Sequence, residues 1–461
     1  MSQAKQKHQH AIGFVNRREL LQVGFTGLLG MGLTDILAGQ AAAAPSRKGP
    51  KAKSVILAFM TGAPAHQDIW DIHPNAPSAY RGAGVAQKTN VPGMEISAWL
   101  PHLAKCADKY ALVRSMTHGI NSHEIGTHFM LTGVDKLPPG ASFMASRNDW
   151  PSMMSGVMYN RPHRGGLPVA VELPTYLNNG YGFSGQNGGI MGSKYDPWLI
   201  RSDPNKASFR VPDLMPLPGM TVNRLGQRQA LLQSVDRQRA DLEAAGVVRQ
   251  LDNAQGDAFK TLTDPRTRQA FDLAQEPTKL RDRYGRHMFG QSLLLARRLV
   301  ESGVAIVQAN MGHMNTWDTH TNLVNRLKNG LLPPFDSGMS ALLEDLDERG
   351  LLEETLVIAV GEFGRTPKMG HDNGGGITAA SGRDHWGGVF TALFAGGGVQ
   401  GGRVVGKSDV EAAYPDGKGF HPSDMGATVY TALGVDPGMV FHDFQGRPFP
   451  LNKGEVIAEL F

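Results

Sequence analysis

The sequence predicts an α/β fold, a doubly wound and mostly parallel sheet with helices on both faces. Two observations lead to this prediction. Short, continuous apolar runs recur along the chain, as expected of strands that are buried on both faces. Amphipathic segments that end at glycine lie between these runs, as expected of helices that cover a parallel sheet.

The elements are placed by these two patterns. Strands are expected at the apolar runs 54–60, 110–114, 304–309, 355–360 and 389–395. Helices are expected at 96–108, at 289–302 before Gly303, up to 349 before Gly350, and from a cap at Ser423 to 433 before Gly434. Glycine is the residue that most easily takes the left-handed conformation in which helices commonly end.

Composition and charge exclude several classes of protein. The chain has 461 residues, of which 41% are hydrophobic, and a formal net charge of +4, which is typical of a globular protein. An excess of four positive charges over a chain of this length creates only a weak positive potential. The sequence also has no cluster of Lys and Arg that could bind a phosphate backbone, so nucleic acid is excluded as a partner. One cysteine, Cys106, excludes an internal disulfide framework and any multi-cysteine zinc site.

The start of the chain has the pattern of an export signal. Arg17-Arg18 precedes a weakly apolar stretch at 23–38, and small residues follow at 41–44. We therefore expect a twin-arginine signal at 1–44 and a periplasmic or extracellular location for the mature protein. The alternative is a short N-terminal helix with two solvated arginines.

The remainder, 45–461, is expected to form the α/β domain, with a charged helical insertion at about 224–284. The apolar stretch of the signal is too short to span a bilayer, and no later run is long enough. We therefore expect no stable membrane span once the signal is removed. The oligomeric state is left open.

Histidines and carboxylates cluster at the ends of the expected strands, most of them after a strand, with Asp384 and His385 just before the one at 389–395. Ligands of open α/β sheets bind at the carboxyl ends of strands, so these residues are candidate metal ligands. They are His66, Asp68, His128, Asp318, His320, Glu362, Asp384 and His385. Any one of these histidines alone would be explained as a buried, hydrogen-bonded loop residue. Together they indicate a divalent metal, with zinc fitting nitrogen and oxygen ligands best and calcium or magnesium as alternatives.

Several long strings of the chain resemble the DUF1501 family, which belongs to the alkaline phosphatase/sulfatase superfamily. The strings are TGAPAHQD at 61–68, THFMLTG at 127–133, YGRHMFGQSLLLA at 284–296, WDTH at 317–320, GEFGRTP at 361–367 and GRDHW at 382–386. The resemblance covers nearly the whole chain. It implies an alkaline-phosphatase-like fold and metal-dependent hydrolysis of phosphate or sulfate esters.

The resemblance also assigns roles to individual residues. The superfamily nucleophile lies about ten residues before a Thr-Gly pair, which implies Ser122, with Thr127 second. His123 or His128 would bind metal or move a proton. Asp318 and His320 match the middle metal pair, Glu362 the later acid, His385 the last histidine, and His66 or Asp68 the first ligand. Arg365 and Arg383 could bind a tetrahedral anion.

Two features limit these implications. Phe363 stands where the superfamily has a metal-binding histidine, which puts a full two-metal centre in doubt. Cys106 begins no C/S-x-P/A-x-R string, so a sulfatase in the strict sense is not expected. The sequence therefore supports an exported metal-dependent hydrolase of small-molecule or glycan esters. The alternative is a non-catalytic, metal-stabilised binding or surface-assembly protein of the same fold.

Overall fold

The computed structural model describes most of the chain. The described residues are 52–138, 144–161, 166–211, 227, 264–313, 315–370 and 378–461. The expected export signal and most of the expected insertion lie outside them. Two helices, α8 (Pro265–Phe271) and α9 (Thr278–Tyr284), lie in the described part of that insertion. None of the helices in these ranges combines the length and the apolarity needed to cross a membrane.

The core of the fold is an eight-stranded sheet with the order β12-β4-β11-β8-β1-β7-β5-β6. Its strands are β1 (Ser54–Phe59), β4 (Tyr110–Met116), β5 (Ala170–Leu173), β6 (Trp198–Leu199), β7 (Ile306–Asn310), β8 (Thr355–Val360), β11 (Phe390–Ala395) and β12 (Arg403–Val405). Within this sheet β11 runs antiparallel to both neighbours, and the other pairs are parallel. The prediction of a mostly parallel sheet is confirmed.

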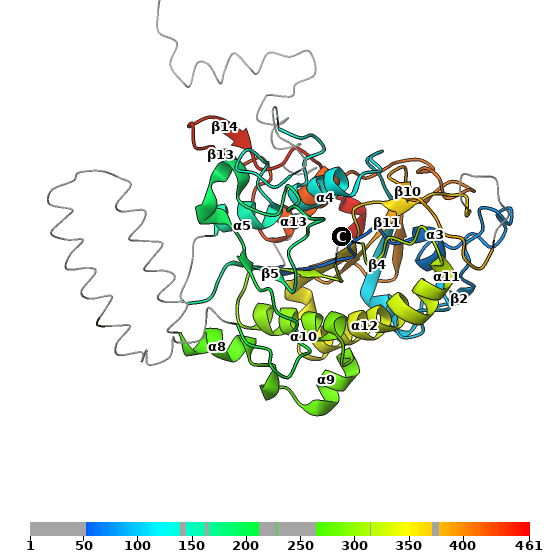
Figure 1. Cartoon of the computed structure of the whole chain (residues 1–461), viewed down its shortest axis with the longest axis horizontal. Coiled ribbons are helices and arrows are strands. Elements are labelled where there is room, and N and C mark those ends of the chain that lie inside the picture. The colour runs from blue at the N-terminus through cyan, green and yellow to red at the C-terminus, as the bar shows by residue number, and fades with distance from the viewer. Residues whose placement is uncertain are drawn as a thin grey trace, which may run out of the picture. The chain divides into compact units, whose positions relative to one another are not determined.

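Both faces of the sheet are covered, as the continuous apolar strands predict (Figure 1). In β1, Ile56 and Ala58 point to one core, whereas Val55, Leu57 and Phe59 point to the other. The first core is closed by α10 (Met288–Glu301) and α12 (Leu332–Glu348), and the second includes residues of α4 (His123–Thr132), α5 (Met153–Asn160) and α13 (Pro422–Ala432).

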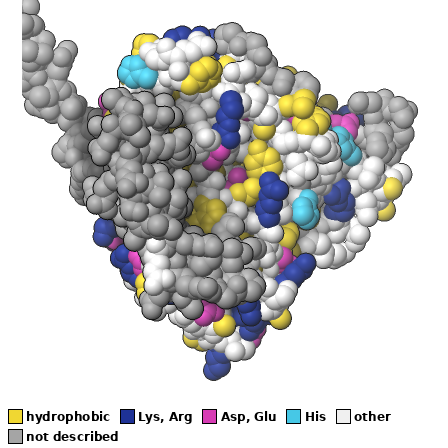
Figure 2. Space-filling model, turned by 60° about the vertical axis from the view of Figure 1, so that its left-hand side comes forward, with side chains coloured by type: hydrophobic (Ala, Val, Ile, Leu, Met, Phe, Trp, Pro, Cys, Tyr) yellow, Lys and Arg dark blue, Asp and Glu magenta, His cyan; other side chains and the backbone are white. Residues whose placement is uncertain are grey.

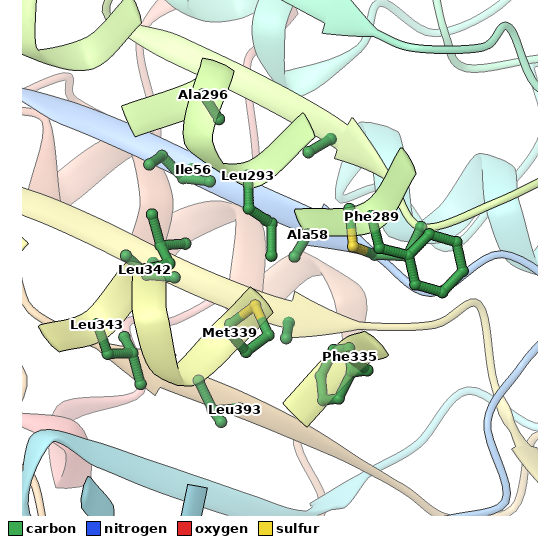
Figure 3. Close-up of a cluster of buried hydrophobic side chains, with 14 of the residues drawn as sticks. Ile56, Ala58, Phe289, Leu293, Ala296, Phe335, Met339, Leu342, Leu343 and Leu393 are labelled. Carbon is green, nitrogen blue, oxygen red and sulfur yellow. The ribbon is translucent and has the colours of Figure 1, made fainter. Parts of the chain in front are cut away.

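The first core shows how tightly the helices lie on the sheet. Figure 3 shows Leu293 of α10 and Met339 of α12 beside Ile56 and Ala58, and none of the four exposes any surface. Burying a side chain of this size contributes about 1.5–3 kcal/mol. Truncating Leu293 to alanine would leave a cavity and cost about 2–5 kcal/mol.

Two expected elements differ in the structure. The helix expected at 96–108 is replaced by β3 (Glu95–Ser97) and a 3₁₀ helix at Leu103–Lys109. Pro101 lies between them, and a proline cannot sit inside an α-helix without losing a hydrogen bond. The last helix, α13, begins at Pro422 with His421 as its cap, not Ser423. Asp424 accepts a hydrogen bond from the His421 backbone, which fixes this earlier start.

The direction of β11 matters for the site. Because β1, β4, β7 and β8 are parallel, their carboxyl ends meet at one edge of the sheet. β11 runs the opposite way, so the segment before it reaches that same edge (Figure 1). Five chain segments that are far apart in sequence therefore converge there.

A buried carboxyl group lies near this edge, within β5. Glu172 is 2% exposed, and its Oε1 accepts a hydrogen bond from Asn310 Nδ2 at 2.9 Å. Burial raises the pKa of Glu172 to about 8, although the bond from Asn310 acts in the opposite direction. The carboxyl group therefore keeps its proton at neutral pH.

Glu172→Gln should stabilise the protein more at about pH 8.5 than at about pH 5. The unfolded carboxyl loses its proton above roughly pH 4.5, whereas the folded one keeps it until about pH 8. The folded parent binds more protons across this window, so its stability falls as the pH rises through it. Glutamine does not titrate, so the difference in unfolding free energy should grow by about 1 kcal/mol or more. Urea unfolding at both pH values measures this, and equal differences would contradict it.

Candidate metal centre

Three imidazole rings face one carboxylate at the edge where the strands converge. Asp318 lies in the loop after β7. Its Oδ2 is 3.4 Å from His123 Nε2, and its Oδ1 is 3.0 Å from His320 Nε2 and 3.2 Å from His385 Nε2. His123, Asp318 and His385 each offer one ligand atom within 4.8 Å of the others.

Each ring reaches this point from a different segment. His123 is the first residue of α4, directly after the loop that follows β4. His320 belongs to the same loop as Asp318. His385 lies in β10 (His385–Trp386), which pairs antiparallel with β9 (Gly364–Arg365) ahead of β11. The topology of the sheet, more than any local motif, brings the three rings together.

The other nitrogen of each ring is held by an oxygen acceptor. His123 Nδ1 is 2.5 Å from Glu362 Oε1, and His320 Nδ1 is 2.6 Å from Asp384 Oδ1. His385 Nδ1 is 2.9 Å from the backbone oxygen of Asn121. When Nδ1 donates to such an acceptor, the Nε2 lone pair of a neutral ring is left free to bind a metal beside Asp318. Metal-binding histidines are commonly oriented in this way.

This arrangement fits a bound cation. The Nε2 atoms of His320 and His385 are only 3.0 Å apart. If both Nδ1 atoms carry hydrogen, two lone pairs face each other beside a carboxylate, which is repulsive unless a positive charge lies between them. Zinc binds histidine nitrogen and carboxylate oxygen at about 2.0–2.2 Å, and four such ligands form a tetrahedron. The residues present therefore fit a zinc-class ion.

The electrostatics of the cluster agree with this fit. Burial opposes a charge on His123, but its bonds to Asp318 and Glu362 outweigh burial and raise its pKa to about 9. Burial also acts to raise the pKa of Asp318, yet His123, His385 and Arg365 hold it well below its usual range. The carboxylate is thus stabilised as an anion, and the metal-free cluster retains a proton on His123 in place of a cation.

A buried arginine, Arg365, pairs with the carboxylate of the cluster. Arg365 Nη2 is 2.5 Å from Asp318 Oδ1, and its Nε donates to the Ala63 backbone oxygen at 2.8 Å. The same loop donates the Gly62 N–H to both carboxylate oxygens of Glu362, at 2.9 and 3.1 Å. Ala63 adopts a positive φ of 63°, an unusual conformation for a residue with a Cβ. Arg365 and this loop therefore position Asp318 and Glu362 together.

Arg365 and Arg383, which the sequence suggested as anion-binding residues, contact groups of the protein itself. Both are completely buried. Arg365 is engaged by Asp318 and backbone oxygens, and Arg383 Nε donates to Asp68 Oδ2 at 2.9 Å while its Nη1 donates to the Thr366 backbone oxygen at 2.9 Å. Burial of an arginine requires such partners, because an unpaired buried charge is costly. In the structure both arginines hold loops and carboxylates of the protein itself.

Three expected ligands have other partners. Asp68 pairs with Arg383, and His66 Nε2 lies 3.1 Å from the Ala412 backbone oxygen. His128 Nδ1 lies 3.0 Å from Ser184 Oγ. Burial lowers the pKa of His66 and that of His128 to about 4, so both are neutral. His128 follows His123 by five residues, which turns it by about 140° around α4 and away from the face of His123.

The two expected nucleophiles differ in access. Ser122 is half-buried at the N-cap of α4, and its Oγ donates to Glu124 Oε2 at 2.7 Å. Thr127 is completely buried within the helix. Only Ser122 of this pair is placed to meet a substrate.

The cluster is open to solvent on one side. The side chains of His320 and Asp384 are 39% and 36% exposed, whereas those of His123 and Asp318 are 11% and 14% exposed. A ligand would therefore approach from the side of His320 and Asp384. Positive surface charge is dispersed on the face shown in Figure 2, where described Lys and Arg side chains lie among Asp, Glu and uncharged surface.

The sequence analysis named Glu362 and Asp384 but missed the backbone groups that orient the cluster. Residue type does not reveal the roles of the Asn121 backbone oxygen and the Gly62 N–H. It also missed His118, whose Nε2 lies 2.6 Å from the Glu362 backbone oxygen and so helps to position Glu362. A glycine after the first strand is a weak signal of a sharp turn, and Gly62 does have a φ of 104°.

Comparisons with known proteins identify the family and a set of distant structures. The family model "Protein of unknown function (DUF1501)" matches residues 52–461. No curated protein matches the chain. Similar solved structures include Ps i-CgsB in complex with k-i-k-neocarrahexaose, at 12% identity and a TM-score of 0.38 over 83% of this chain and 72% of that one.

Two further structures are similar at the same level. The lipoteichoic acid synthase LtaP from Listeria monocytogenes has 9% identity and a TM-score of 0.40 over 86% of this chain and 76% of that one. The phosphonate monoester hydrolase SpPMH from Silicibacter pomeroyi has 12% identity and a TM-score of 0.37 over 88% of this chain and 75% of that one.

Asp384→Ala should weaken zinc binding by about 10–100-fold, because loss of an outer carboxylate frees the metal-binding imidazole. The change removes the acceptor of His320 Nδ1 at a partly exposed position, so the fold should be unaffected. Competition with a chromophoric chelator measures the affinity. Asp416→Ala is the matched control, since that exposed carboxylate pairs with Lys407. Equal affinities in the two variants would remove Asp384 from the centre.

Proposed function

The chain belongs to the DUF1501 family, and we propose that it is a metal-dependent hydrolase of phosphate or sulfate esters. One observation carries this proposal. Three imidazole rings present Nε2 to the carboxylate of Asp318, and each ring is oriented through Nδ1 by an oxygen acceptor. Metal-binding histidines almost always donate their second ring nitrogen to such an acceptor, which fixes the orientation of the ring.

Zinc suits this donor set best. Calcium and magnesium prefer shells made only of oxygen ligands, and three imidazoles count against both. A bound zinc ion would polarise a phosphoryl or sulfuryl oxygen and so favour attack on the ester. The protein's own part is to hold the ligands: Glu362 and Asp384 fix two of the rings, and Arg365 fixes Asp318.

The attacking group in this proposal is Ser122, which immediately precedes His123 in the chain. Its hydroxyl lies at the start of α4, where the backbone N–H groups favour a developing negative charge. The substrate would be a small-molecule or glycan ester that enters from the exposed side of the cluster.

A second function remains supported by one observation. The Phe363 ring stacks on His123, with centroids 5.1 Å apart and an interplanar angle of 28°, and Phe363 is completely buried. An apolar ring therefore fills the place where the superfamily has a further metal ligand. This favours a single metal centre, and it is the observation behind the alternative of a metal-stabilised binding or surface-assembly protein.

An ester assay separates the two functions. We expect the zinc-loaded parent to hydrolyse at least one of three generic substrates, a phosphomonoester, a phosphodiester and a sulfate ester. Ser122→Ala and His123→Ala should lose about a hundredfold or more in kcat, whereas the buried Thr127→Ala should retain it. Metal analysis of an Asp318→Ala, His385→Ala double variant should show loss of the ion. No turnover by the parent, with metal bound in full, would favour the binding protein.

We also propose that the protein is exported folded by the twin-arginine route to the periplasm or beyond. The support is the sequence pattern of Arg17-Arg18 before a weakly apolar stretch. Replacing both arginines with lysine should leave uncleaved precursor in the cytoplasm, as measured by cell fractionation and immunoblotting. The matched control is Lys5→Arg, Lys7→Arg, which keeps the charge and leaves the pair intact. Normal export of the first variant would exclude this route.

A further inference from the structure

We propose that Glu124 is the catalytic base that takes the proton of Ser122, a role that rests on the proposed hydrolytic function. The two side chains lie two residues apart at the start of α4, outside the metal cluster itself. Three observations lead to this inference, and each concerns the Ser122 hydroxyl or the Glu124 carboxylate.

The first is a capping bond that Ser122 does not make. A serine at the N-cap of a helix ordinarily accepts a hydrogen bond from a backbone N–H of the first turn. Here the Ser122 side chain makes no such bond, and its Oγ donates to Glu124 Oε2 at 2.7 Å. As a donor the hydroxyl keeps its own lone pairs available for attack. Ser122 therefore lacks the stabilisation of a capping bond, and its hydroxyl is hydrogen-bonded to the Glu124 carboxylate instead.

The second observation is a hydrogen bond that orients the Glu124 carboxylate. Tyr181 OH donates to Glu124 Oε1 at 2.9 Å, so both carboxylate oxygens accept a hydrogen bond from a hydroxyl group. The resulting order is nucleophile, base and orienting group, the same order by which other serine nucleophiles are activated. Tyr181 lies in the Gly- and Asn-rich loop after β5, and its contact with Glu124 places that loop beside the start of α4.

The third observation is the position of Ser122 and Glu124 on either side of His123 in the chain. His123 lies between Ser122 and Glu124 in the chain, and its Nε2 faces Asp318. For Ser122 to attack, the phosphorus or sulfur atom of the substrate must lie at the start of α4 while one of its oxygens is polarised at the cluster. Glu124 is half-buried, so proton exchange with solvent is open to it.

The chemical step balances with these groups and solvent water. Ser122 Oγ forms a bond to the phosphorus of R–O–PO₃, and the bond from phosphorus to the leaving oxygen breaks. The Ser122 proton passes to Glu124, and the leaving RO⁻, which departs on the side of phosphorus opposite Oγ, takes a proton from solvent as ROH. Water then attacks from that opposite side, gives one proton to solvent and releases phosphate, and Ser122 regains its hydroxyl proton from Glu124. A sulfate ester follows the same course.

The first test needs no metal. Diisopropyl fluorophosphate should label Ser122 in the purified mature protein both with zinc and after chelation, as mapped by peptide mass spectrometry. The Oγ–P bond forms, the P–F bond breaks, fluoride leaves and the proton goes to Glu124. Glu124→Gln should slow labelling by about tenfold or more, and Ser122→Ala should abolish it. Asp424→Asn, which removes a first-turn carboxylate from α13, is the control and should label at the parental rate.

The second test uses turnover. Glu124→Ala should lose about a hundredfold in kcat with zinc stoichiometry unchanged, and added formate should restore part of the rate. Tyr181→Phe should lose less, because the base is loosened but present. Circular dichroism confirms folding of each variant.

The outcomes separate this inference from the proposed function. Parental labelling and turnover in Glu124→Gln would overturn the base while leaving the hydrolase intact. A parent that labels at Ser122 in a Glu124-dependent manner but hydrolyses no ester would overturn the hydrolase and keep the activated serine. A parent that neither labels nor turns over would overturn both.

Discussion

The buried ion pair between Arg365 and Asp318 is the interaction on which the edge of the sheet depends. Removing a guanidinium and a carboxylate from water costs several kcal/mol for each ion, and the attraction between them offsets this only if every remaining donor finds an acceptor. Arg365 meets this condition, because it also donates to the backbone oxygens of Ala63 and Arg383. One side chain thereby ties the loops after β1 and β7 to β9. Removing it would leave the half-buried Asp318 without its arginine partner, which we expect to destabilise the edge of the sheet.

The strands and their common edge could be predicted because the relevant signal is local. A run such as that of β1 or β8 is apolar at every position after its first residue, as expected of a strand covered on both faces. The carboxyl-end rule then placed Asp318 and Glu362 near one another with no knowledge of the strand order. His385 precedes its strand, so it reaches the same edge only because β11 runs antiparallel to its neighbours.

The partners of individual side chains could not be predicted in the same way. An arginine such as Arg383 could bind a ligand or pair with a carboxylate of the protein. Its pairing with Asp68 depends on the packing of loops that are far apart in the sequence, which the residue type alone does not reveal. His128 shows the second reason. It lies in the same short helix as His123, and a difference of five residues turns it from the cluster towards Ser184. The helix at 96–108 failed for a local reason, since Pro101 interrupts a pattern that otherwise favours a helix.

The stacking of Phe363 on His123 has a further consequence for the centre. An imidazole held between an aromatic ring and two carboxylates loses water on its apolar face and keeps electrostatic partners on its edges. Loss of water alone would lower its pKa, but the two carboxylates reverse that effect and make the ring a site of positive charge. A metal ion must displace this proton in order to bind. The same surroundings that retain the proton in the free protein therefore supply the negative charge that holds the ion after exchange. Phe363 stands where the family resemblance implies one further metal-binding histidine, and its contact with His123 therefore favours the proposal of one metal centre over two.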